Sequence, residues 1–349
     1  MKTKAVLALV LVGALWSVAP AQLAEPGKEF DKTGQAGMTF LKIGPLARAA
    51  GMGDAYTSLS VGASGAFYNP AGLGFLDGKF EVLLGRVNWM ADIAISSASV
   101  GVPLRIGKAG RVAVVGLSIV SMDYGDIYGT VIDRSATAQF RDVGKLEPTE
   151  SALGLTLAKQ FTDKFSLGIT AKYVTQSLPW YATGGRDRSP DPVSQDAKAG
   201  VLAFDGGTLY RTGFGSSVIS MSIRNFARSQ VYENDRLLLP MTFSIGLAAD
   251  VLDLAPGLQR AGHRLMVSGD GFHPPDHPEK FALGGEYSFR ELVFLRGGYS
   301  FNHDVRTVSL GTGLRYSYAG FRGAFDYAYT NFGTSLGSVN YFTFTFGMD

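Results

Sequence analysis

Apolar and polar residues alternate along most of the chain, from about residue 79 to the C-terminus. The segments 165–173 (FSLGITAKY), 241–247 (MTFSIGL) and 341–346 (YFTFTF) show the alternation most clearly. A period of two places successive side chains on opposite faces of an extended backbone, which is typical of β-strands. The pattern therefore predicts an all-β protein.

Fourteen segments carry this alternation, most of them about 10 to 14 residues long, the usual length of a barrel strand. They are 79–89, 91–103, 110–122, 150–161, 164–178, 198–210, 215–227, 239–252, 261–273, 278–290, 291–301, 305–318, 319–331 and 336–347. An even number of strands is what single-chain barrels of the bacterial outer membrane require.

The chemistry of the two strand faces indicates a membrane environment. A soluble sandwich would carry many Lys and Glu on its outer face, whereas the polar face here consists mostly of Gly, Ser, Thr and Ala. An apolar outer band around a polar lumen is typical of membrane barrels, and aromatic residues collect at the strand ends. The aromatic residues near predicted strand ends are Trp89, Tyr124, Tyr173, Trp180, Tyr299, Tyr316, Tyr318, Tyr327 and Tyr329. We therefore predict a transmembrane antiparallel β-barrel.

The lengths of the connections alternate as well. Long connections at 123–149, 179–197 and 228–238 follow odd-numbered strands, and most connections after even-numbered strands are short. Bacterial barrels have short periplasmic turns and longer extracellular loops. The alternation predicts a periplasmic N-terminus and extracellular long loops, with 253–260 as a moderately long exception.

The first 21 residues predict export. Lys2 and Lys4 precede an apolar run from Ala5 to Trp16, and Ala19-Pro-Ala21 supplies the small residues that a signal peptidase recognises. We expect residues 1–21 to be a cleaved signal peptide and the mature protein to lie in the bacterial outer membrane. No later run of about 18 apolar residues predicts a membrane-spanning helix.

Residues 22–78 lack the alternation and are rich in Ala, Gly and Ser. Their size and position predict an N-terminal segment and hatch that packs in the periplasmic mouth of a barrel formed by residues 79–349. Residues 22–36 are expected to form a partly disordered tail.

Composition narrows the function classes further. The chain has 45 Gly, 23 Phe and 15 Tyr, an enrichment typical of closely packed β-structure, and it has no Cys for disulfides or thiolate metal sites. Without Lys2 and Lys4, the 32 basic residues become 30 and balance 30 Asp and Glu. A mature chain of zero net charge is not expected to bind nucleic acid.

Two stretches near the N-terminus carry a resemblance to a known family. They are residues 44–59 (GPLARAAGMGDAYTSL) and 63–73 (ASGAFYNPAGL). With these motifs the chain resembles the PorV/PorQ family of outer-membrane proteins, which is related to FadL-type fatty-acid transporters. The resemblance covers the whole length and implies fourteen strands behind an N-terminal hatch. The residues of this hatch motif that we single out are Arg48, Gly51, Gly53, Asn69, Pro70 and Gly72.

The motif names no substrate, and its residue types favour a structural role. Asn69 before Pro70 forms a turn and can cap backbone groups, and Gly72 permits a sharp change of direction. We expect these residues to shape the hatch and not to touch a ligand.

Several charged residues are predicted to point into the lumen. They are Lys172, Arg224, Glu286, Arg290, Arg296, Arg315, Arg322 and Asp326. Buried charges are costly unless they are paired or hydrated. Arg322 with Asp326, and Glu286 beside Arg296 or Arg315, can form a ladder that holds the hatch. The alternative is an arginine site for an anionic headgroup, such as a fatty-acid carboxylate.

Catalytic, metal and cofactor sites are not expected. The chain has no Gly-x-Ser-x-Gly elbow, no His-Glu-x-x-His and no phosphate-binding Gly loop. The turn His273-Pro-Pro-Asp-His277, near Asp270 and Glu279, brings possible metal ligands together, but its spacing matches no standard site. We predict a non-enzymatic protein without metal or cofactor.

The two longest loops carry aromatic residues that can bind a partner or close the barrel mouth. The candidates are Tyr124, Tyr128, Trp180 and Tyr181. The family resemblance implies a role in protein secretion and surface attachment of the type IX kind, with secreted cargo or secretion proteins as partners besides outer-membrane lipid. The alternatives are a passive transporter that takes a hydrophobic ligand into its lumen and a mainly structural barrel.

Overall fold

A closed antiparallel barrel of fourteen strands forms the body of the molecule. The computed structural model describes residues 36–105, 111–132, 139–182, 193–228, 230–232, 235–303 and 308–349, so the predicted signal peptide lies outside the described residues. The barrel strands are β1 (Phe80–Asn88), β2 (Ala94–Arg105), β3 (Arg111–Asp123), β6 (Thr149–Gln160), β7 (Phe165–Ala182), β8 (Val193–Arg211), β9 (Val218–Ala227), β12 (Thr242–Asp250), β13 (His263–His273), β14 (Lys280–Phe289), β15 (Val293–Phe301), β16 (Val308–Tyr318), β17 (Phe321–Asn331) and β18 (Ser338–Met348).

Neighbouring strands in the sequence pair antiparallel around the whole barrel. The last strand, β18, pairs with the first, β1, from Phe80 opposite Met348 to Asn88 opposite Asn340, and this pairing closes the sheet. The predicted fold class, a barrel of about fourteen antiparallel strands, is confirmed.

Two of the predicted loops contain further strands. The connection 123–149 holds the hairpin β4 (Ile127–Ile132) and β5 (Phe140–Leu146), and 228–238 holds β10 (Gln230–Tyr232) and β11 (Asp235–Leu237). Their alternating runs are shorter than a barrel strand, so the sequence did not distinguish them from loops.

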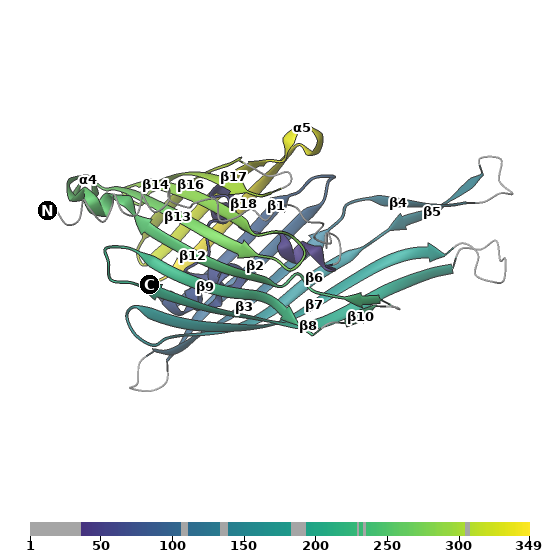
Figure 1. Cartoon of the computed structure of the whole chain (residues 1–349), viewed down its shortest axis with the longest axis horizontal. Helices are drawn as coiled ribbons and strands as arrows, with labels where there is room; N and C mark the ends of the chain where they lie inside the picture. The colour runs from purple at the N-terminus through teal and green to yellow at the C-terminus, as the bar shows by residue number, and fades with distance from the viewer. Residues whose placement is uncertain are drawn as a thin grey trace, which may run out of the picture.

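The two ends of the barrel differ. The β4–β5 hairpin and the extensions of β7 and β8 project from one end, which we call the long-hairpin end (Figure 1). The other, short-turn end carries Asp349 and the turn between β6 and β7 (Figure 1). The exception predicted at 253–260 is also at the short-turn end and contains η5 (Val251–Leu254) and α4 (Pro256–Arg260). Between β17 and β18, α5 (Gly333–Leu336) lies at the edge of the long-hairpin end.

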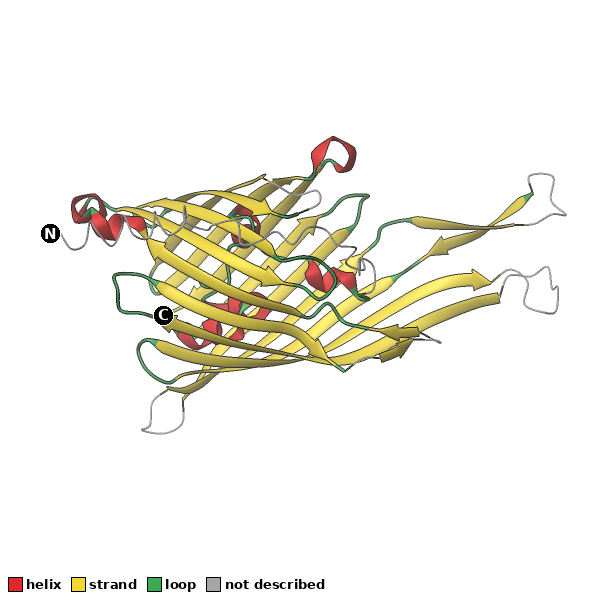
Figure 2. Ribbon diagram, viewed as in Figure 1, coloured by secondary structure: helices red, strands yellow, loops and turns green. Residues whose placement is uncertain are grey.

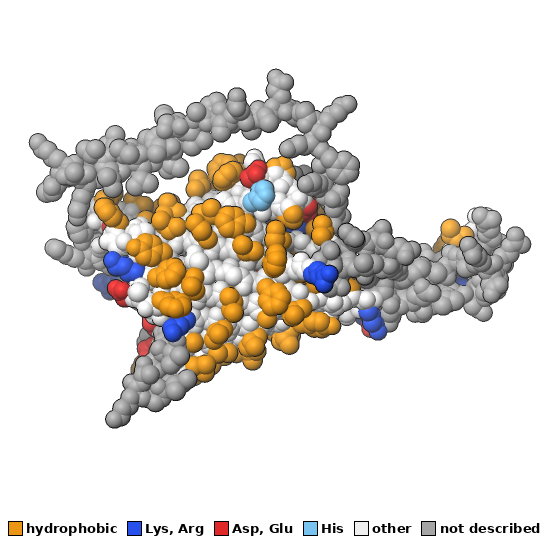
Figure 3. Space-filling view, turned by 60° about the horizontal axis from the view of Figure 1, so that its bottom comes forward, with side chains coloured by type: hydrophobic (Ala, Val, Ile, Leu, Met, Phe, Trp, Pro, Cys, Tyr) orange, Lys and Arg blue, Asp and Glu red, His pale blue; other side chains and the backbone are white. Residues whose placement is uncertain are grey.

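Large apolar side chains cover the outside of the barrel. On β6, Leu153, Leu155 and Leu157 point outward and are about half exposed, while Thr156 and Ala158 are buried toward the lumen. Figure 3 shows hydrophobic side chains spread over the visible face of the barrel, with Lys and Arg side chains toward its two ends. Thus the outer surface is apolar and the inner face carries the small and polar residues.

The lumen is filled by residues 36–78, which we call the lumenal segment. Its helices are η1 (Thr39–Lys42), α2 (Ala47–Gly51), η2 (Gly62–Ser64), α3 (Gly65–Tyr68) and η3 (Pro70–Phe75). Figure 2 shows these short helices among the barrel strands. No helix in the described ranges is long and apolar enough to cross a membrane.

The lumenal segment extends through the barrel from end to end. Ala36 forms a parallel bridge with Leu238 near the long-hairpin end, and the Ser166 hydroxyl, at the short-turn end, donates to the Ala71 carbonyl in η3. The segment thus extends beyond the single mouth in which the sequence predicted a hatch to pack. The segment has no periodic pattern, so its path could not be predicted from the sequence. Its apolar first turn packs between the strand ends at the opposite mouth.

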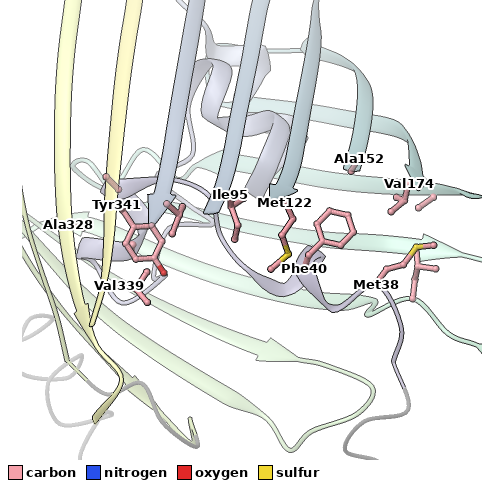
Figure 4. Packing of buried hydrophobic residues seen from close by; sticks show 14 of the residues in the cluster. Met38, Phe40, Ile95, Met122, Ala152, Val174, Ala328, Val339 and Tyr341 are labelled. Carbon is pink, nitrogen blue, oxygen red and sulfur yellow. The ribbon is translucent and has the colours of Figure 1, made fainter. Parts of the chain in front are cut away.

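The first turn of the lumenal segment closes the long-hairpin end with a hydrophobic cluster. Met38 and Phe40 pack against Ile95, Met122 and Val174 of the wall, and all five side chains are buried (Figure 4). Burial of such side chains is worth about 1.5–3 kcal/mol each. The cluster therefore stabilises the closed mouth.

The middle of the segment lies directly on the barrel wall at glycines. The Cα of Gly311 would lie 3.1 Å from a Cβ added to Gly51, and the backbone nitrogen of Gly53 would lie 2.1 Å from a Cβ added to Gly298. Gly53 also has a φ of 66°, which a side chain would strain. The paired glycines let two backbones touch, so α2 is held against β15 and β16.

Candidate functional site

A cavity of about 400 Å³ lies in the long-hairpin half of the lumen, between the lumenal segment and the barrel wall. Its aromatic lining residues are Tyr68, Trp89, Phe272, Phe281, Phe301, Phe332 and Tyr341. Its ionisable lining residues are Lys42, Asp54, Arg224, His277, Lys280 and His303. Ligand sites of this kind are mostly apolar with a few polar groups that orient the ligand.

A second cavity, of about 40 Å³, lies behind the lumenal segment. Small wall residues line it, among them Ser118, Ala152 and Gly154 of β3 and β6. Ile43 and Arg224 line both cavities. These two side chains therefore lie at the boundary between the two cavities.

A network of buried charges joins the lumenal segment to the wall. Arg48 of α2 donates two hydrogen bonds to Glu286 of β14, at 2.8 and 2.7 Å. Arg296 of β15 donates to the same carboxylate at 2.6 Å, and its Nη2 lies 2.8 Å from Oδ1 of Asp326 as an ion pair without hydrogen-bond geometry. Burial alone would lower the pKa of Arg48, but the Glu286 carboxylate raises it above its usual range. The Arg48 guanidinium is therefore a cation.

The predicted pairing of Glu286 with Arg296 is thus present, and Arg48 joins it from the hatch motif. Arg315 lies instead with its guanidinium 4.2 Å from the centre of the Phe294 ring. Because Arg48, Glu286, Arg296 and Asp326 line neither cavity, they hold the segment and do not face the ligand space.

Two predicted lumen charges lie elsewhere. Arg322 does not pair with Asp326; its Nε lies 2.8 Å from Oδ1 of Asp349 and its Nη2 donates to the Asp77 carbonyl, at the short-turn end. Arg290 lies in an exposed turn with a φ of 51°, so the prediction that it points inward is wrong. The strand β14 ends one residue earlier, and the alternation does not continue into the turn.

A second polar cluster surrounds Lys172 on β7. Its ammonium lies 2.8 Å from the Asp205 carboxylate and donates to the Asn225 side chain at 2.6 Å. Asn225 has a φ of 61° where the register between β8 and β9 shifts. Arg224, next to it, donates to the Phe67 carbonyl at 3.2 Å and lies 5.7 Å from the centre of the Tyr68 ring.

The remaining residues of the hatch motif shape the short-turn half of the segment. The Asn69 side chain accepts from the Ala71 amide at 3.2 Å, which caps η3, and donates to the Thr208 carbonyl at 3.0 Å. Pro70 is the first residue of η3, and a Cβ on Gly72 would lie 1.6 Å from the Ser60 carbonyl oxygen. None of these three residues lines a described cavity.

One anchor of the segment was missed at the sequence level. The Asp270 carboxylate of β13 accepts from the backbone amides of Tyr56 at 2.9 Å and Thr57 at 2.7 Å. In the sequence, Asp270 is prominent only as a neighbour of the histidine turn. The available signal was a lone acid on the small-residue face of a strand.

The histidine turn contacts the lumenal segment. His273 lies 3.2 Å from Glu279, His277 lies 3.1 Å from Asp276, and Lys42 of η1 pairs with Asp276. Burial would raise the pKa of Asp276, but hydrogen bonds from Lys42 and His277 hold it below its usual value. In the described part of the chain, no three acid, Cys or His side chains form a group that could hold a metal ion.

The loop candidates are separated from one another. Tyr124 is partly buried against the mouth cluster, whereas Tyr128 on β4 is 72% exposed. Trp180 and Tyr181 lie on the extension of β7, opposite Gln195 and Ser194 of β8, and their side chains are outside the described parts.

Comparison with known proteins identifies the fold. No protein-family model and no curated protein matches the sequence. The chain is similar to a solved structure described as the CymD monoaromatic hydrocarbon channel, with a TM-score of 0.52 and 13% identity over 87% of this chain and 96% of that chain. It is also similar to the toluene transporter TodX of Pseudomonas putida, with a TM-score of 0.53 and 13% identity over the same shares of the two chains.

These identities are low, so the likeness bears on the fold alone. The PorV/PorQ resemblance gains no support from a sequence match and stays a prediction. The chain has the fold of the FadL-like barrels, a closed antiparallel sheet of fourteen strands.

Proposed function

We propose that this protein is an outer-membrane channel that passively transports small hydrophobic molecules. The observation that carries the proposal is the cavity of about 400 Å³, which lies between the lumenal segment and the wall and is lined by aromatic side chains. The names of the similar structures, a hydrocarbon channel and a toluene transporter, favour this function over the predicted role in secretion.

Passive transport needs a binding site and a path through the barrel. The cavity is the candidate binding site. A molecule arriving at the long-hairpin end, which we place outside the cell, meets the first turn of the lumenal segment, whose residues Thr39 and Lys42 line the cavity. Below it, α2 and η3 fill the lumen. We therefore expect the lumenal segment to act as the gate.

The uptake experiment compares a bacterial host that produces the full chain with the same host carrying an empty vector. We expect labelled toluene, at a concentration that limits uptake, to enter faster in the producing cells. A variant with Ala282→Phe, which fills the cavity from β14, should return uptake toward the host level. Equal uptake with and without a folded barrel contradicts the proposal.

The membrane location predicts a strong effect of an outward charge. Leu155 lies near the middle of β6 and is 55% exposed, so Leu155→Arg should destabilise folding into lipid vesicles by about 2–4 kcal/mol. Denaturant titration in vesicles measures the change. Ile132→Arg on the β4–β5 hairpin, beyond the barrel, is the matched control, and an equal effect at both positions would count against the location.

Partner binding at the long-hairpin end is a second candidate function. Tyr128, Ile132 and Phe140 of the β4–β5 hairpin are all more than half exposed, and exposed apolar groups are found at protein interfaces. A gentle-detergent pull-down of the full chain should recover secreted proteins that share a C-terminal domain if the protein serves secretion. Identical recovery with residues 127–146 deleted would exclude the hairpin as the binding site.

A further inference from the structure

Arg224 occupies a distinctive place in the lumen. It projects from β9, lines both cavities, and lies next to the shift in register between β8 and β9. Its neighbours from the lumenal segment are the Phe67 carbonyl, at 3.2 Å from Nη1, and the Tyr68 ring. Its guanidinium thus lies where the aromatic cavity adjoins the second cavity.

Three other cations in the lumen have carboxylate partners, and Arg224 differs from these three. Arg48 and Arg296 share Glu286, and Lys172 pairs with Asp205. Within the described residues, no carboxylate pairs with Arg224, and its buried Nε has no hydrogen-bond acceptor. A half-buried guanidinium with one carbonyl contact and a buried Nε without an acceptor retains donors for an incoming acceptor.

The rest of the cavity lining favours a ligand of opposite charge with an aromatic body. Among the described lining residues, Lys42, Arg224 and Lys280 are cations and Asp54 is the one acid. Aromatic rings prefer offset or edge-on contact with other rings, and the lining includes Trp89, Phe272, Phe332 and Tyr341 among others. A carboxylate accepts two parallel hydrogen bonds from a guanidinium.

We propose that the larger cavity is a binding site for a compact aromatic carboxylate and that Arg224 is the residue that selects it. The ring occupies the aromatic part of the cavity and the carboxylate meets the guanidinium. The inference rests on the proposed channel function and narrows its substrates to aromatic carboxylates. The similar structures are named for monoaromatic hydrocarbons and toluene, which carry no carboxylate.

The test measures binding of benzoate and toluene to the purified full-length protein in detergent by titration calorimetry. We expect Arg224→Met to weaken benzoate binding by about tenfold to a hundredfold, the value of a charged hydrogen-bonded contact, and to leave toluene binding within about twofold. Arg315→Met is the matched control, because Arg315 also lies in the lumen beside an aromatic ring but lines neither cavity. It should change neither affinity.

A second measurement needs no variant, in case Arg224→Met does not fold. Phenylglyoxal modifies accessible arginines, and peptide mass mapping reports the extent at Arg224. Benzoate should slow this modification, and toluene should not.

The outcomes separate this inference from the channel function. Toluene uptake without benzoate binding, benzoate binding unchanged in Arg224→Met, or equal losses in Arg224→Met and Arg315→Met would each overturn the inference and leave the channel standing. Failure of both uptake and binding of either compound would overturn the channel function itself.

Discussion

Replacing Glu286 with Ala is expected to lower the free energy of unfolding by about 3–5 kcal/mol, the usual cost of breaking a buried ion pair. Glu286 is the only carboxylate described that contacts both Arg48 and Arg296, so its loss leaves two buried cations poorly compensated. Urea unfolding of the barrel in lipid vesicles, followed by tryptophan fluorescence, measures the change. Glu279→Ala, which removes an exposed carboxylate paired with His273, should leave the unfolding midpoint unchanged.

A double-mutant cycle then shows whether the lumenal segment shares this stability. Arg48→Ala alone and together with Glu286→Ala should reveal a coupling free energy of about 0.5–3 kcal/mol, because the two side chains are in contact. Additive effects would mean that α2 contributes nothing through this contact and that the network stabilises only the wall.

Cross-linking the first turn of the lumenal segment to the wall is expected to abolish uptake of toluene. Ala36 and Leu238 are bridge partners, and neighbouring strands lie about 4.8 Å apart, within the range that a disulfide spans. The chain has no Cys, so Ala36→Cys with Leu238→Cys forms the only possible intramolecular disulfide. Under oxidising conditions uptake should fall to the host level, and dithiothreitol should restore it.

The single variants Ala36→Cys and Leu238→Cys serve as controls and should transport normally under both conditions. Unchanged uptake in a fully cross-linked sample would show that the first turn need not leave the mouth. A path between the segment and the wall, where the second cavity lies, would then be required.

Most of the barrel was predictable because its signal is periodic. The expected strand 150–161 is observed as β6 at Thr149–Gln160, and the expected 291–301 as β15 at Val293–Phe301. The expected ends of β7 and β8 were too short by several residues. These strands continue beyond the barrel as a hairpin, in which Ala182 is paired with Val193.

Contacts in the buried charge network could be predicted only where both residues lie on neighbouring strands. Glu286 lies directly opposite Arg296 in the register of β14 and β15, which follows from two adjacent alternating segments. The expected pair of Arg322 with Asp326 fails because residues four apart on one strand are separated by about 13 Å. The contact of Arg48 with Glu286 could not be predicted, because it depends on the path of the lumenal segment, whose sequence has no periodic pattern.

Closure of the barrel through β1 and β18 also fixes the order in which the chain can mature. The lumenal segment is synthesised before any strand, but the side chains that hold Arg48 and its partners belong to β14, β15 and β17, among the last to be made. The α2 part of the segment therefore cannot reach these partners until nearly the whole chain has been made, whereas η2 and η3 have their partners on the early strands β1, β2, β7 and β8. A chain truncated before β14 would therefore lose the partners of Arg48 together with the strand β18 that closes the sheet.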